Sequence, residues 1–143
     1  MSAGEERLGN SSRRSPAASA AEPFEIAALL RRCMYDHELA ARLIEKFTGR
    51  LAATIQEIEQ GVEAKNWSSV TSRLHNLKGE AGSLAAVELA SIAEELRECL
   101  FEGHIQAGVV HLVQLKAAAE RCIQFRSTIA ERLEQSASAA SQG

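Results

Sequence analysis

Residues 67–84 read WSSVTSRLHNLKGEAGSL, and this stretch carries the most regular apolar pattern in the chain. Its apolar residues recur at alternating steps of three and four, which is typical of a helix with one narrow buried stripe. Asn66 stands directly before the stripe and is a suitable N-cap. The pattern predicts an amphipathic helix whose buried face carries Trp67, Val70, Leu74, Leu77, Ala81 and Leu84.

Helical periodicity continues toward the N-terminus. Asp36 is a candidate N-cap for a long helix that runs to about residue 62, and Gly61 should weaken the end of that helix. A short helix is predicted from Pro23 through Cys33, because proline is well tolerated at a first helical position. We expect this short helix to pack as a lid on the longer ones.

Two further helices are predicted after residue 84, the first ending near Gly103 and the second covering about residues 109–133. Short loops between long amphipathic helices favour antiparallel neighbours. The predicted fold is therefore all-α, an antiparallel up-down four-helix bundle with an extra short N-terminal helix. It would span residues 23–135 between two disordered tails, residues 1–22 and 136–143, whose Ser- and Ala-rich composition cannot bury a core.

Composition supports this fold class and excludes several functions. The chain has 143 residues and two prolines, with none after Pro23, and it is poor in the aromatic residues that strand-rich folds use. The net charge of −3 gives no basic footprint, so nucleic acid is not an expected partner. No apolar signal segment or membrane-spanning run occurs, so we expect a cytoplasmic protein without a membrane partner.

The three cysteines are widely spaced and lie in apolar helical patterns, which favours reduced core thiols over a redox or metal role. They are Cys33, Cys99 and Cys122. His37, His104 and His111 lack neighbours at ligand spacing and are interpreted as surface residues, so no metal is assigned. The charged run at residues 94–98 is interpreted as the solvated side of its helix.

The outer face of the helix at 67–84 is unusual. His75 points about 130° away from the centre of the buried stripe on a helical wheel. Every residue within about 60° of it is small or polar. Two of them are glycines, and each costs about 0.8–1.0 kcal/mol relative to alanine inside a helix. The set comprises Ser68, Thr71, Ser72, Lys78, Gly79 and Gly82.

The two glycines favour close approach of another molecule to this face. Two structural alternatives stay open, namely that the glycines end the helix or that they let a neighbouring helix of the same chain pack tightly. Both remain because sequence alone does not show what lies opposite Gly79 and Gly82.

The segment from His75 to Leu84, HNLKGEAGSL, resembles the H-x-L-K-G signature of histidine-containing phosphotransfer (HPt) domains, and the likeness extends over about residues 24–133. The resemblance implies a carrier of phosphoryl groups in a His-Asp relay of a two-component system. His75 matches the phosphorylated histidine and Lys78 its basic neighbour. The family usually has glycine after the leucine that corresponds to Leu84, whereas this chain has Ala85.

The residues fit that chemistry. An exposed imidazole is mostly neutral in the cytoplasm and has a lone pair for attack on phosphorus. Lys78, one turn later, would offset charge on the transferred phosphoryl oxygens. The sequence contains no Gly-rich phosphate-binding loop, so we expect neither ATP binding nor kinase activity. It also has no carboxylate cluster near His75, so we expect no cofactor on this protein and Mg²⁺ only on the partner.

The expected partners are receiver domains of hybrid sensor kinases and response regulators. They would dock on the small residues around His75, and the protein itself would be a monomer. Two other functions remain open: the phosphate-accepting domain of a chemotaxis-type histidine kinase, and a passive helical adaptor with a merely exposed His75. The docking residues would be Ser68, Thr71, Ser72, Gly79 and Gly82.

Overall fold

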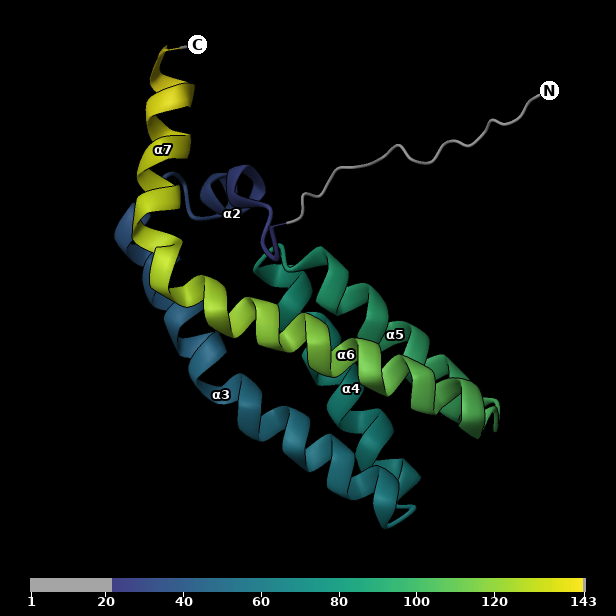
Figure 1. Ribbon diagram of the computed structural model, residues 1–143. Coiled ribbons are helices and arrows are strands. Elements are labelled where there is room, and N and C mark those ends of the chain that lie inside the picture. The colour runs from purple at the N-terminus through teal and green to yellow at the C-terminus, as the bar shows by residue number, and fades with distance from the viewer. Residues whose placement is uncertain (1–21, 143) are drawn as a thin grey trace, which may run out of the picture.

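The computed structural model describes residues 22–142, which are helical over most of their length (Figure 1). No strand occurs among these residues, which confirms the all-α fold class. The predicted N-terminal tail lies outside the described residues, except for Glu22. In chain order the elements are α2 (Ile26–Arg32), α3 (His37–Glu63), α4 (Trp67–Ser83), α5 (Val87–Phe101), α6 (Ile105–Phe125), the 3-10 helix η2 (Arg126–Thr128) and α7 (Ile129–Gln142).

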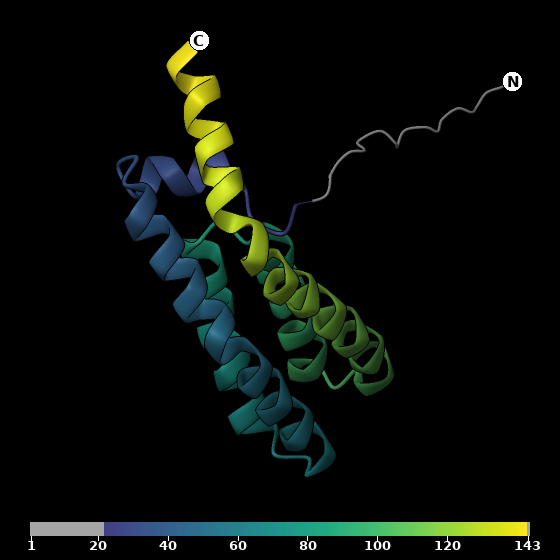
Figure 2. The same ribbon diagram turned by 60° about the vertical axis from the view of Figure 1, so that its left-hand side comes forward.

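Four long helices share one apolar core. Helix α4 packs against α3 and α5, and α6 packs against α5 and α3, so that the four surround a common interior (Figure 2). Burial of each large aliphatic side chain contributes about 1.5–3 kcal/mol, which makes this core the main source of stability. All four helices supply fully buried residues, among them Ile44, Leu51, Ile58, Leu74, Leu77, Leu89, Leu96 and Leu115.

The three turns that join these helices share one backbone motif. In each turn the second residue after the helix has a positive φ, namely 57° at Lys65, 62° at Ala85 and 82° at Gly103. The N–H of the following residue donates to a carbonyl five residues back, as in a Schellman motif. Ala85, at the position where HPt domains usually carry glycine, therefore has the backbone conformation that glycine favours, at a cost of roughly 1–2 kcal/mol.

The N-terminal segment differs from the prediction at Pro23. Helix α2 begins at Ile26 with Glu25 as its N-cap, so Pro23 precedes the helix rather than opening it. Phe24 is buried and its ring lies 6.4 Å from that of Phe47 and 5.9 Å from that of Phe125. The buried ring anchors the segment before α2, and the helix begins at Ile26, three residues after Pro23.

The C-terminal region also differs from the prediction of one helix over 109–133. The helix is interrupted at η2, where the hydroxyls of Ser127 and Thr128 donate to the carbonyls of Gln124 and Phe125 and compete with the helical ladder. Helix α7 then continues to Gln142, past residue 135, where the bundle was predicted to give way to a tail. Its Ala-rich sequence has no glycine or proline before residue 143, so nothing in it breaks the helix.

Both predicted N-caps are confirmed. Asp36 Oδ1 accepts from the Leu39 N–H at 3.0 Å, and Asn66 Oδ1 accepts from the Ser69 N–H at 3.4 Å. Gly61 also has a role that the sequence did not indicate, although α3 runs through it and ends two residues later, at Glu63. A Cβ added at Gly61 would lie 2.5 Å from the Cγ2 of Val70, so this glycine allows the start of α4 to approach α3.

Replacing Gly61 by alanine should lower the free energy of unfolding, because the new methyl group meets the buried, β-branched Val70. Gly49→Ala in the same helix is the matched control, since a Cβ there meets nothing within 4 Å and helix propensity favours alanine by about 1 kcal/mol. Overpacking costs about 1–3 kcal/mol, so urea unfolding should separate the two variants by about that amount. Equal stability of the two variants would contradict the close approach.

Candidate functional site

Helix α4 presents His75 on the side opposite the core. Val70, Leu74, Leu77 and Ala81 are buried against α3 and α5, with exposed fractions of 1% or less. His75 lies between two of these buried positions in sequence, but on the exposed side of the helix. The predicted orientation of His75 therefore agrees with the structure, and the buried stripe determines it.

Ion pairs fix α4 on its α3 side. Arg73 Nη1 lies 2.7 Å from Glu57 Oε1, and Glu80 Oε2 lies 2.5 Å from Arg50 Nη2. These four side chains are about half exposed, so each pair contributes little to stability. They pair the charged side chains on that flank of α4 with α3, so the face around His75 consists of small and polar residues.

Lys78 makes the corresponding contact on the α5 side. Its Nζ lies 3.3 Å from Oε1 of Glu94, and Glu94 also accepts two hydrogen bonds from Arg97, from Nε at 3.0 Å and from Nη2 at 2.8 Å. The Arg97 hydrogen bonds, aided by Lys78, lower the pKa of Glu94 to about 2. The carboxylate is thus charged at any physiological pH and holds the Lys78 ammonium.

Sequence reasoning missed Glu94 and Arg97 as neighbours of the candidate site. It placed both on the solvated side of their helix, whereas both are only partly exposed. The i, i+3 spacing of a carboxylate and an arginine was a usable signal for their pairing. Contact with Lys78, however, depends on how α4 and α5 are registered against each other, which the pattern of one helix does not contain.

The glycines beside His75 face open space. A Cβ placed on Gly79 or Gly82 meets nothing within 4 Å, so neither glycine serves to pack α4 against another helix of the described chain. That structural alternative is wrong. The helix ends at Ser83, so ending the helix accounts for Gly82 at most and not for Gly79.

The C-terminal end of α4 is held by the N-terminal segment. Arg32 Nη1 donates to the carbonyls of Gly82 and Ser83, the latter at 3.0 Å, and the Glu25 N–H donates to the Ala85 carbonyl at 2.9 Å. A cation at a helix C-terminus is also favoured by the helix dipole. The last turn of α4, which carries Gly82, is therefore held in place on the side of α2.

The other predicted docking residues lie on the same helix but differ in exposure. Ser68 and Ser72 are exposed, whereas Thr71 is half-buried. The Thr71 hydroxyl donates to the backbone carbonyl of Trp67 at 2.9 Å, so it is occupied within the helix. Ser68, Ser72 and Gly79 thus offer the exposed part of the predicted docking face, and the partly buried Thr71 and Gly82 lie at its margin.

The three cysteines are the remaining nucleophilic candidates. Cys33 and Cys122 are buried and Cys99 is partly buried, all as free thiols. Burial raises the pKa of Cys122 to about 12 and also raises that of Cys33, so neither thiol is a reactive group. No cluster of metal-ligating side chains occurs within residues 22–142.

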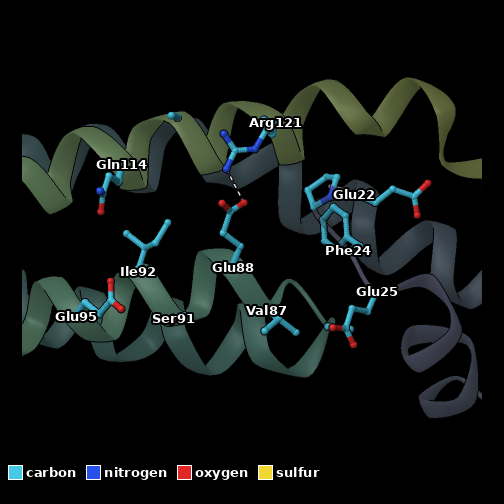
Figure 3. Close-up of a pocket in the computed structure, with 13 residues that line it drawn as sticks. Glu22, Phe24, Glu25, Val87, Glu88, Ser91, Ile92, Glu95, Gln114 and Arg121 are labelled. Atoms are coloured by element: carbon cyan, nitrogen blue, oxygen red, sulfur yellow. Dashed lines mark hydrogen bonds and ion pairs between the residues drawn. The ribbon is translucent and has the colours of Figure 1, made fainter. Parts of the chain in front are cut away.

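An open cleft of about 1420 Å³ lies between α5, α6 and the segment before α2, and the Glu88–Arg121 ion pair spans it (Figure 3). None of its lining residues belongs to α4. The cleft is thus separate from the face that carries His75.

Within the described part of the chain, no helix has the length and hydrophobicity needed to cross a bilayer.

Comparison with known families identifies the class of protein. The sequence profile of the Hpt domain matches residues 42–143, which is most of the chain. No match was found among curated proteins or solved structures. The chain belongs to the Hpt domain family, whose members are phosphocarrier modules of two-component signalling that interact with receiver domains.

Replacing Arg97 by glutamine should raise the pKa of Glu94 from about 2 toward its ordinary value of 4.5, because the strongest cause of the lowering is removed. A lowered carboxyl pKa stabilises the fold above pH 4.5, and that contribution is lost as the pH falls toward 2. The variant should therefore lose less stability over this acid range. Carboxyl ¹³C NMR titration measures the shift, Arg121→Gln is the control, and an unchanged Glu94 pKa would contradict the assignment.

Proposed function

We propose that this protein is a phosphorelay carrier in which His75 accepts a phosphoryl group from one receiver aspartate and passes it to another. The observation that carries the proposal is an exposed imidazole on the outer face of α4, flanked by open space at Gly79 and Gly82 and by Lys78 one turn later. Membership of the Hpt family supports the same chemistry.

In the forward step, a lone pair on the neutral His75 imidazole attacks phosphorus of the receiver's aspartyl phosphate. The new N–P bond forms as the P–O bond to aspartate breaks, and the electron pair leaves with the aspartate carboxylate. The proton on the other ring nitrogen stays in place, so no general base is needed. The reverse sequence loads the next receiver.

The chain's own contribution to catalysis is mainly positioning. The up-down four-helix bundle predicted from the sequence would serve as a rigid frame that holds His75 away from the core. Ser68, Ser72 and Gly79 would admit the receiver surface, with Thr71 and Gly82 at the margin. The Mg²⁺ that such a transfer uses would come with the receiver, while this protein would act as a cytoplasmic monomer with no ATP site, cofactor or kinase activity of its own.

His75→Gln should abolish transfer of label from a ³²P-phosphorylated cognate receiver, because glutamine keeps the size of the side chain but lacks the nucleophilic ring nitrogen. His104→Gln, which changes an exposed histidine at the N-cap of α6, should leave labelling unchanged. The label on the wild-type protein should be acid-labile, as phosphohistidine is. Continued labelling of His75→Gln would overturn the assignment, and a wild-type protein that takes no label from any receiver would favour a passive adaptor.

Gly79→Leu should weaken receiver binding while leaving the isolated protein at least as stable as the wild type. A side chain at this position has open space within the chain, and leucine favours helix by roughly as much as alanine does. Gly49→Leu on α3, where a Cβ also meets nothing, is the matched control and should leave affinity unchanged. Calorimetric titration with the receiver measures the affinity of both variants. Undiminished affinity for Gly79→Leu would refute close approach at this face.

A further inference from the structure

The ammonium of Lys78 has two possible anionic partners. In the structure its Nζ lies 3.3 Å from Glu94 Oε1 on the adjacent helix α5. The other partner would be a phosphoryl group on His75, one turn earlier on α4. Lys78 is about half exposed, so its four-carbon stem is free to turn from one to the other.

Glu94 has a second charge partner besides Lys78, namely Arg97. Arg97 donates to both of its oxygens, and the Arg97–Glu94 pair is less exposed than Lys78. A carboxylate that already accepts two charge-assisted hydrogen bonds stays satisfied when a third donor leaves. Departure of Lys78 therefore leaves the Glu94 carboxylate paired with Arg97.

We propose that Glu94 and Arg97 are positioning residues for Lys78: Glu94 holds the ammonium toward α5 while His75 is bare, and Arg97 keeps this hold weak enough for the ammonium to move to the phosphoryl oxygens once His75 is loaded. This inference rests on the proposed role of His75. Glu94 supplies the resting partner of the lysine. Arg97 weakens that attraction by neutralising the carboxylate, so that the exchange is easy.

The charges favour the exchange in this direction. Attack by the neutral imidazole leaves a phosphoryl group with two negative charges on a ring with one positive charge, so the loaded site carries a net charge of about −1. The Glu94 carboxylate is already offset by Arg97, whereas the new phosphoryl charge has no fixed cation among the small residues beside it. A mobile ammonium is therefore held more strongly by the phosphoryl oxygens.

The experiment loads His75 with phosphoramidate, which transfers its phosphoryl group directly to histidine with release of ammonia and needs no receiver. Loading is followed by ³¹P NMR. Glu94→Gln should speed loading about two- to fivefold, the scale of one surface ion pair. Arg97→Gln should slow loading by a similar factor, because the carboxylate then retains Lys78 more strongly. Glu95→Gln, which removes the same charge from the next residue of α5, should change nothing.

A double-mutant cycle separates action through Lys78 from a direct effect of charge. In a Lys78→Met background, Glu94→Gln and Arg97→Gln should no longer alter the loading rate. The Lys78 ¹⁵Nζ resonance of the wild type should shift on loading, while Arg97 keeps its contact with Glu94. Effects that persist without Lys78, effects of the same sign in both variants, or no effect at all would overturn the positioning role.

Failure of the proposed function would look different. It would show as phosphorylation that survives His75→Gln, or as a wild type that phosphoramidate does not load at His75. If the wild type is loaded at His75 but the loading rate does not change in Glu94→Gln and Arg97→Gln, only the positioning role is refuted. The two results are read from the same set of spectra.

Discussion

Burial of the apolar stripe of α4 is the constraint on which the rest of this structure depends. Val70, Leu74, Leu77 and Ala81 have essentially no exposed surface, and three of them are large enough to contribute about 1.5–3 kcal/mol each. A rotation of the helix by one residue turns every side chain by 100° and would expose this stripe. The orientation of His75 is therefore set by several kilocalories per mole of packing that His75 itself does not provide.

The charged residues of α4 complete what the packing begins. Arg73 and Glu80 are paired with α3, and Lys78 with α5, so both flanks of the helix are occupied by ion pairs with its neighbours. Such exposed pairs add little to stability. They instead separate the helix surface into two charged borders and a small, uncharged strip between them, and that strip is the part to which another molecule has access.

The sequence was sufficient to predict the buried stripe of α4, the outward direction of His75 and the two side-chain N-caps, because each depends on residues within one helix. It was insufficient for the interruption at residues 126–128, because the apolar periodicity continues through this 3-10 turn. It also did not reveal the Lys78–Glu94 contact, which depends on the mutual register of two helices. Gly61 illustrates the same limit, because the need for glycine at this position comes from a side chain of the next helix, that of Val70.

The contacts made by the segment before α3 change how the extent of this domain is understood. The family profile begins at residue 42, inside α3, yet Glu25 and Arg32 bond to the backbone at the end of α4, and Glu22 pairs with Arg132 of α7. Phe24 also fills space between α3 and the end of α6. A boundary drawn by family likeness alone would cut through a structural unit that begins at least twenty residues earlier, at the segment that secures the helix bearing His75.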